Sequence, residues 1–264
     1  MEGSTVQWRK LCSSKTAIFG MVVVLLATLV SLFCYRISPD ATPNANRMQV
    51  EIAGKKPGFS QRFLLLPKTP RPPETSWWQR MLYGQADSCQ FLPIAGHTVS
   101  DTAFIVDRYI DEGLSEKMSL PFQQVGGSAS DRIITRTFWL GTDKFGRDIL
   151  SRLLIGTRVS LLVGAVAMLI SLLIGTLLGA LAGYYGGRAD DIIMWFINVI
   201  WSIPTLLLVF ALTLLLGKGF WQVFVAVGLT MWVNVARLVR GQVMQVRSLE
   251  YVQAAKALGF NDLR

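Results

Sequence analysis

Histidine and cysteine are scarce in this chain, and their scarcity limits the chemistry available to it. The only histidine is His97, and no Cys or carboxylate lies at metal-ligand spacing from it. We therefore expect an ordinary loop histidine rather than a metal ligand. Three cysteines occur, and of these only Cys89 lies well away from the apolar stretches described below. One such thiol builds no internal disulfide framework.

A nucleotide-binding loop is also lacking, because no G-x-x-x-x-G-K-[ST] run occurs anywhere in the chain. Acidic residues are fewer than basic ones, 17 against 26, which gives a formal net charge of +9. Many of the basic residues fall in one long polar segment, residues 36–156. We therefore do not interpret the positive charge as a nucleic-acid footprint, and we expect no nucleic-acid partner.

Charge is nearly absent from four long apolar stretches in a chain that is 52% hydrophobic. A helix needs about 20 apolar residues to cross a bilayer, because its backbone groups must be satisfied within the segment. Only Arg237 enters a stretch, at the end of the last one. We predict four transmembrane helices, over residues 16–35, 159–185, 192–216 and 220–238.

The charged flanks of these stretches predict a topology. Basic residues in the segment 1–15 place the N-terminus in the cytoplasm, and no small-x-small site follows the first helix to support the alternative of a cleaved signal peptide. The segment 36–156 would then lie outside, and residues 157–264 would form the main membrane domain. Four crossings return the chain to the cytoplasm, where the basic tail agrees with the positive-inside bias.

Two features of the external segment suggest contact with the membrane. Trp77 and Trp78 would rest in the membrane interface or belong to a small external core, and the sequence favours neither. Near the end of the segment, Asp148 would begin a short interfacial helix with apolar residues on one face. An ordinary capped turn before the second transmembrane helix remains the alternative.

Glycine recurs at every fourth residue along one side of the second apolar helix. This small-xxx-small spacing predicts a face on which another helix packs closely, although it does not identify that helix. The residues of this stripe are Gly175, Gly179, Gly183 and Gly187.

Pro204 in the third apolar helix removes a backbone hydrogen bond and should bend or open the helix. Asn198 and Ser202 are spaced i to i+4 beside that bend. They would line a substrate path, or they would simply form hydrogen bonds between helices.

A short helix is predicted over residues 248–259, after the last crossing. Ser248 is a suitable N-cap, Glu250 complements the helix dipole, and Gly259 suits a C-terminal stop. Ala254 and Ala255 would let a partner surface approach closely. Because a helix of this length is not stable alone in water, we expect it to rest on the membrane domain, on a partner, or on both.

Two runs carry a resemblance to a known family. GTDKFGRDILSRLLIGTRVSLLVG resembles the entry to the second helix of the permease subunits of bacterial ABC importers for dipeptides, oligopeptides or nickel. QAAKALG resembles their EAA loop, which contacts the ATPase, with Gly259 at the family's glycine position. Gln253 stands where the motif usually has Glu, so a salt bridge there would become a neutral hydrogen bond.

The resemblance implies an all-α polytopic helix bundle of six transmembrane helices in the bacterial inner membrane. Only four are present, so the chain looks truncated after the EAA loop, and the external insertion of mixed structure is larger than the resemblance explains. It implies a non-enzymatic subunit without a cofactor, because ATP and Mg²⁺ would bind partner ATPase subunits. The other implied partners are a second homologous permease, an extracytoplasmic solute-binding protein and membrane lipid.

Two other functions remain as alternatives. A membrane-anchored sensor or enzyme would use the segment 36–156, where we see only scattered titratable residues and no catalytic constellation. A truncated protein without function is the third possibility.

Overall fold

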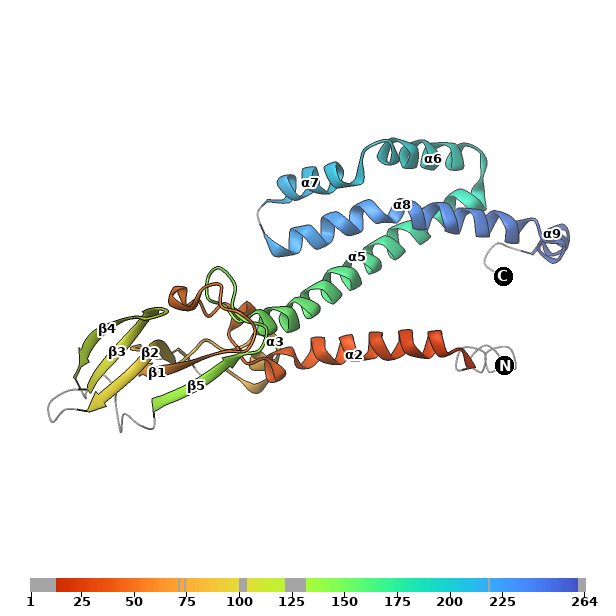
Figure 1. Ribbon diagram of the computed structural model, residues 1–264. Helices are drawn as coiled ribbons and strands as arrows, with labels where there is room; N and C mark the ends of the chain where they lie inside the picture. The colour runs from red at the N-terminus through yellow and green to blue at the C-terminus, as the bar shows by residue number, and fades with distance from the viewer. Residues whose placement is uncertain are drawn as a thin grey trace. The chain divides into compact units, whose positions relative to one another are not determined.

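The computed structural model describes residues 13–70, 72–73, 75–99, 104–121, 132–217 and 219–260 (Figure 1). The chain divides into two compact units, an N-terminal unit of residues 1–159 and a C-terminal unit of residues 160–264. Helix α5 (Ile149–Tyr185) begins in the first unit and continues into the second.

The N-terminal unit begins with helix α2 (Lys15–Ile37), which matches the expected first span to within two residues at each end. Two 3-10 turns follow, η1 (Pro43–Ala45) and η2 (Val50–Ile52), and a short helix α3 (Trp77–Tyr83) lies between the first two strands. Trp77 and Trp78 open α3 and are each 64% exposed, so they are not part of a core.

A five-stranded antiparallel sheet is the main element of the segment between α2 and α5. Its order is β4-β3-β2-β1-β5, so β2 is the central strand and β4 and β5 are the two edge strands. The strands are β1 (Phe59–Pro67), β2 (Cys89–Val99), β3 (Phe104–Asp111), β4 (Leu114–Leu120) and β5 (Ile133–Phe138). The expected all-α class therefore describes the helical parts of the chain, whereas the insertion is a sheet.

The sheet buries apolar side chains on both faces. Phe63 and Leu64 are consecutive in β1, point to opposite faces, and are both fully buried. Leu64 belongs to a cluster with Ile94 and Phe104, while Phe63 packs with Ile52 and Phe138 on the other face. Burying both faces gives a domain this small a core that a one-sided sheet would lack. His97 lies in β2, opposite Val106, and is not the loop residue that we expected.

The GTDKFGRD run joins β5 to α5 and ties the 3-10 turns to the helix start. The Thr142 hydroxyl donates to the Ile52 carbonyl at 2.5 Å, and Gly54 N–H donates to the Asp143 carbonyl at 2.9 Å. Gly146 has φ +71° and lies directly against Gln49, where a Cβ would meet the Gln49 carbonyl. Only glycine fits this conformation and this contact.

Asp148 is the N-cap of α5, as the sequence predicts. Its carboxylate accepts hydrogen bonds from the Ser151 N–H, at 3.0 Å, and from the Ser151 hydroxyl. That hydroxyl in turn accepts from Asp40 N–H at 2.9 Å. The helix then runs without a break to Tyr185, so the separate interfacial helix and the expected start at residue 159 are both wrong. Nothing between Ile149 and Val159 interrupts helical hydrogen bonding, since no proline occurs there.

The C-terminal unit holds the rest of α5 and four further helices among its described residues: α6 (Gly187–Trp201), α7 (Thr205–Leu216), α8 (Phe220–Arg247) and α9 (Glu250–Ala257). In Figure 1, α6 and α7 follow one another along α8. By length and composition, α2, α5 and α8 are each able to cross a membrane, and α6 with α7 make a fourth candidate span bent by 92°.

The third expected helix, over residues 192–216, is interrupted at Pro204 as the sequence predicted. Helix α6 ends at Trp201 and α7 begins at Thr205, because proline cannot continue α6 and instead precedes the first turn of α7. The fourth helix does not end at Leu238 but continues to Arg247. Charged residues end an apolar stretch, but they do not end a helix.

Candidate functional site

The glycine stripe of α5 faces α8. A Cβ on Gly179 would lie 2.4 Å from the Ala236 carbonyl oxygen, and one on Gly183 would lie 2.8 Å from that of Arg240. At Gly175 it would lie 2.6 Å from the Val235 Cβ. These distances are below van der Waals contact, so only glycine permits the two backbones to approach this closely.

Gly187 does not belong to this contact. It opens α6 with φ +51°, and a Cβ there would meet nothing within 4 Å. The preceding Gly186 also has positive φ, +65°, so this pair makes the turn between α5 and α6. The four-residue spacing in the sequence therefore includes one glycine, Gly187, that lies beyond the end of α5.

Two polar contacts extend the contact between α5 and α8 and link α8 to α6. The Ser171 hydroxyl of α5 donates to the Gly228 carbonyl of α8 at 3.0 Å. Arg240 of α8 forms a two-bond ion pair with Asp190 of α6, with both N–O distances 2.5 Å. The close glycine contact and a hydrogen bond thus join α5 to α8, and an ion pair joins α8 to α6.

The predicted docking helix is α9, which spans Glu250–Ala257 and has no buried residue. Its N-cap is Leu249 and not the expected Ser248, because the Ser248 hydroxyl donates to the Gln245 carbonyl within α8. Gly259, with φ +76°, ends the helix, as predicted. Phe260 N–H donates to the Ala255 carbonyl and Gly259 N–H to that of Lys256, which together form a Schellman motif.

The exposed side of α9 carries the residues singled out by the sequence. Glu250, Gln253 and Ala254 are exposed and Ala255 is half-buried. The Gln253 side-chain amide donates to the Ser248 carbonyl at 3.3 Å, which ties it to the turn between α8 and α9. The other side of α9 contacts α5 and α8. The Lys256 Nζ lies 5.1 Å from the ring centroid of Tyr184 in α5, and Val252 lines an apolar groove with Val243 and Val246 of α8.

At the break between α6 and α7, the two predicted polar residues do lie together. The Ser202 hydroxyl donates to the Asn198 carbonyl at 2.8 Å, which satisfies a group within the last turn of α6. The Asn198 side-chain oxygen accepts from Arg237 of α8 at 2.6 Å. The Arg237 guanidinium also lies over Trp201, 3.7 Å from its ring centroid. The sequence showed Arg237 as the single charge in an apolar stretch, but its partners become visible only in the structure.

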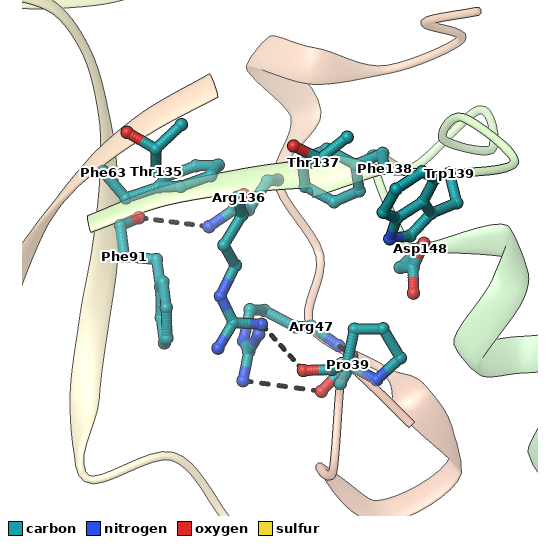
Figure 2. Close-up of a pocket in the computed structure, with 13 residues that line it drawn as sticks. Pro39, Arg47, Phe63, Phe91, Thr135, Arg136, Thr137, Phe138, Trp139 and Asp148 are labelled. Atoms are coloured by element: carbon teal, nitrogen blue, oxygen red, sulfur yellow. Dashed lines mark hydrogen bonds and ion pairs between the residues drawn. The ribbon is translucent and has the colours of Figure 1, made fainter. Parts of the chain in front are cut away.

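The N-terminal unit contains a cavity of about 330 Å³ between β5 and the segment that follows α2. Figure 2 shows Arg136 of β5 extending toward Pro39, to whose carbonyl it donates at 2.9 Å. Arg47 lies beside it and pairs with Asp87 through two bonds of 2.6 Å. Both guanidinium groups approach the Phe91 ring, at 4.0 Å for Arg47 and 4.8 Å for Arg136.

The charges around this cavity are largely matched. Burial and the neighbouring Arg47 lower the pKa of Arg136, while Asp87, Asp40 and Asp148 act in the opposite direction. Asp40 accepts the backbone N–H groups of Thr42 and Arg47, and Asp148 caps α5. We interpret the cluster as the polar interior of the domain. Among the residues that the structure describes, no group of three or more His, Cys, Asp and Glu side chains is arranged to hold a metal ion.

Two segments of the chain match known protein families. Residues 175–264 match the binding-protein-dependent transport system inner membrane component, and residues 5–52 match the N-terminal transmembrane domain of oligopeptide transport permease C. The first segment includes the break between α6 and α7, all of α8 and all of α9. Neither includes the strands of the sheet.

Individual relatives are transport permeases. The chain is 42% identical over 130 residues to the oligopeptide transport system permease protein OppC of Bacillus subtilis, an alignment that covers 49% of this chain and 43% of the relative. It is 48% identical over 126 residues to the dipeptide permease protein DppC of the same organism, with 48% and 39% covered. For the glutathione permease protein GsiD of Pectobacterium atrosepticum the identity is 46%, with 47% and 41% covered. The chain thus spans about two fifths of the length of these curated relatives.

Proposed function

We propose that this chain, which belongs to the family of dipeptide and oligopeptide transport permeases, is a transmembrane subunit of an ATP-driven importer of di- or oligopeptides. The observation that carries the proposal is the match over residues 175–264, which ends on an exposed helix closed by Gly259. Its relatives are transport permeases and not enzymes, so the alternative of a membrane-anchored sensor or enzyme is not favoured.

In this proposal the helices lie in the bacterial inner membrane with the N-terminus in the cytoplasm. The sheet would then lie outside, where a solute-binding protein or a second permease would meet it. ATP and Mg²⁺ would bind cytoplasmic ATPase subunits, and this chain would hold no cofactor. The uncharged faces of α5, α7 and α8 would contact lipid or the second permease.

The coupling would pass through α9. One side of α9 rests on α8 and on Tyr184, so a push on its exposed side would be transmitted to α8. From α8 the glycine contact leads to α5, and the Asp190–Arg240 pair leads to α6. A small movement at the ATPase would in this way bias a helix bundle between two arrangements.

The test is copurification of the tagged full-length chain from membranes of its own organism. We expect the wild type to bring down ATPase subunits and Gly259→Asp to lose them, because a side chain at φ +76° strains the helix stop and adds charge to the docking surface.

Gly217→Asp is the matched control. Gly217 also has positive φ, +90°, meets nothing within 4 Å, and follows α7 far along the chain from α9. It should therefore keep the ATPase subunits. If the wild type brings down none, or if both variants retain them equally, the proposal is wrong.

A further inference from the structure

Arg237 of α8 lacks the kind of carboxylate partner that its neighbour Arg240 has. Arg240, one turn later, is paired by two bonds with Asp190. Arg237 forms no ion pair among the described residues, and its Nε is buried without a hydrogen-bond partner. Within the described part of the chain, its side chain donates one hydrogen bond, to the neutral amide of Asn198. The cation is therefore held in place but not neutralised.

The surroundings of Arg237 make an unneutralised charge costly. The residue before it, Ala236, is fully buried in an apolar cluster with Ile197 and Trp232. Arg237 lies near the end of the apolar stretch of α8, and its guanidinium contacts Asn198 and Trp201 within the bent candidate span formed by α6 and α7. Charged groups inside membrane spans are rare and mark substrate or ion pathways.

The break between α6 and α7 lies directly beside this charge. The guanidinium covers Trp201, the last residue of α6, and the chain is non-helical from Ser202 to Pro204. Non-helical backbone at membrane depth is tolerated where it is enclosed by protein or lines a water-filled path. A cation, an amide and an interrupted helix thus come together at one place.

We propose that Arg237 binds the carboxylate of the transported peptide as it passes the break between α6 and α7. A guanidinium has five N–H donors in a planar fork that matches a carboxylate, and Arg237 uses one of them for Asn198. Every peptide with a free C-terminus carries such a carboxylate at neutral pH. This inference rests on the proposed function and adds a recognition site within the membrane.

The experiment uses proteoliposomes that contain the full-length chain with the subunits that copurify with it. ATP-driven uptake of a dipeptide and of its C-terminal amide is measured, and the ratio of the two rates is compared between variants. One solute-binding protein is added in the same amount to every variant, so a change in this ratio reports on the membrane subunit alone.

We expect Arg237→Gln to lower the ratio of acid to amide uptake by about tenfold or more, which corresponds to the loss of one charge-assisted hydrogen bond. Arg237→Lys should retain part of the preference because it keeps the charge. Arg240→Gln, the matched control, should slow both peptides equally, since Arg240 is already neutralised by Asp190.

Three results would overturn the inference. If the ratio of acid to amide uptake in Arg237→Gln stays within about twofold of wild type while both rates fall, Arg237 only stabilises the break between α6 and α7. If Arg240→Gln loses the preference for the dipeptide over its amide to the same extent, the effect comes from the overall positive charge and not from a site at Arg237. Uptake of both peptides that depends on anionic lipid only when Arg237 is present would assign the guanidinium to a lipid phosphate. Absence of any ATP-driven uptake in the wild type would instead contradict the proposed function.

Discussion

Adding one methyl group at Gly179 tests the close approach of α5 to α8. The new Cβ would lie 2.4 Å from the Ala236 carbonyl oxygen and 3.0 Å from both the Ala236 Cα and the Val239 Cβ. Two of these atoms are backbone and the third is β-branched, so no side-chain rotation relieves the clash. The helices must separate by roughly 1 Å to restore ordinary contact distances. Overpacking of this kind costs about 1–3 kcal/mol in the free energy of unfolding.

Gly164→Ala is the control within the same helix. A Cβ at Gly164 meets nothing within 4 Å, so the substitution should leave stability unchanged or raise it by up to about 1 kcal/mol through helix propensity. Unfolding of the purified chain in mixed detergent micelles, followed against the fraction of a denaturing detergent, measures both variants on one scale. If Gly179→Ala is as stable as Gly164→Ala, the close contact between α5 and α8 does not exist and the reasoning is refuted.

The other glycines of the stripe provide an ordered series. The nearest atom to an added Cβ is 2.4 Å away at Gly179, 2.6 Å at Gly175 and 2.8 Å at Gly183. The loss of stability on substitution by Ala should follow that order. An order reversed between Gly179 and Gly183 would contradict the geometry even if every variant were destabilised.

The sequence predicted this contact face but included one glycine, Gly187, that does not belong to it, and the reason is local. Spacing of four residues identifies a face only while the chain stays helical. Gly186 and Gly187 both have positive φ, so the chain turns before the fourth glycine is reached. Neither did the spacing name α8 as the partner, because helix pairing depends on contacts between residues more than fifty positions apart, such as Gly179 with Ala236.

The five strands of the sheet were not predicted from the sequence. Strand β1 buries both Phe63 and Leu64, on opposite faces, so it lacks the apolar–polar alternation that marks a half-buried strand. Its partners are far away in the sequence, with Leu64 opposite Ile133 on one side and Leu92 on the other. Single-residue patterns do not encode such pairing, so the sequence predicts only mixed structure for this segment.

The charged contacts of the C-terminal unit show a similar limit. Arg237 stood out as a lone charge in an apolar stretch, and Asn198 stood out beside a proline, but nothing in the sequence joined them. Their hydrogen bond depends on how α6 lies along α8. A charged residue in an apolar stretch can therefore be singled out from the sequence, but the groups that it contacts are known only from the fold.

Three further predictions concern carboxylates in both units. Asp148→Ala should destabilise the start of α5 by about 0.5–2 kcal/mol through loss of its N-cap, seen as faster hydrogen exchange in the first turn; unchanged exchange would contradict the cap. A double-mutant cycle with Asp190→Asn and Arg240→Gln should give a coupling energy of about 0.5–3 kcal/mol in the free energy of unfolding, whereas additive effects would show that the ion pair contributes nothing. For Asp143, burial acts to raise the pKa, but hydrogen bonds from the Arg147 guanidinium and from nearby backbone N–H groups outweigh it and hold the pKa below its usual value. Because the folded-state pKa is depressed, the stabilisation is fully present above the ordinary value of about 3.9 and is lost as the pH falls through the folded-state pKa. Thermal unfolding between neutral and strongly acidic pH should therefore show a smaller loss of stability in Asp143→Asn than in the wild type, because the amide cannot be protonated in that range. Equal losses in the two proteins would mean that the Asp143 carboxylate does not hold the turn between β5 and α5.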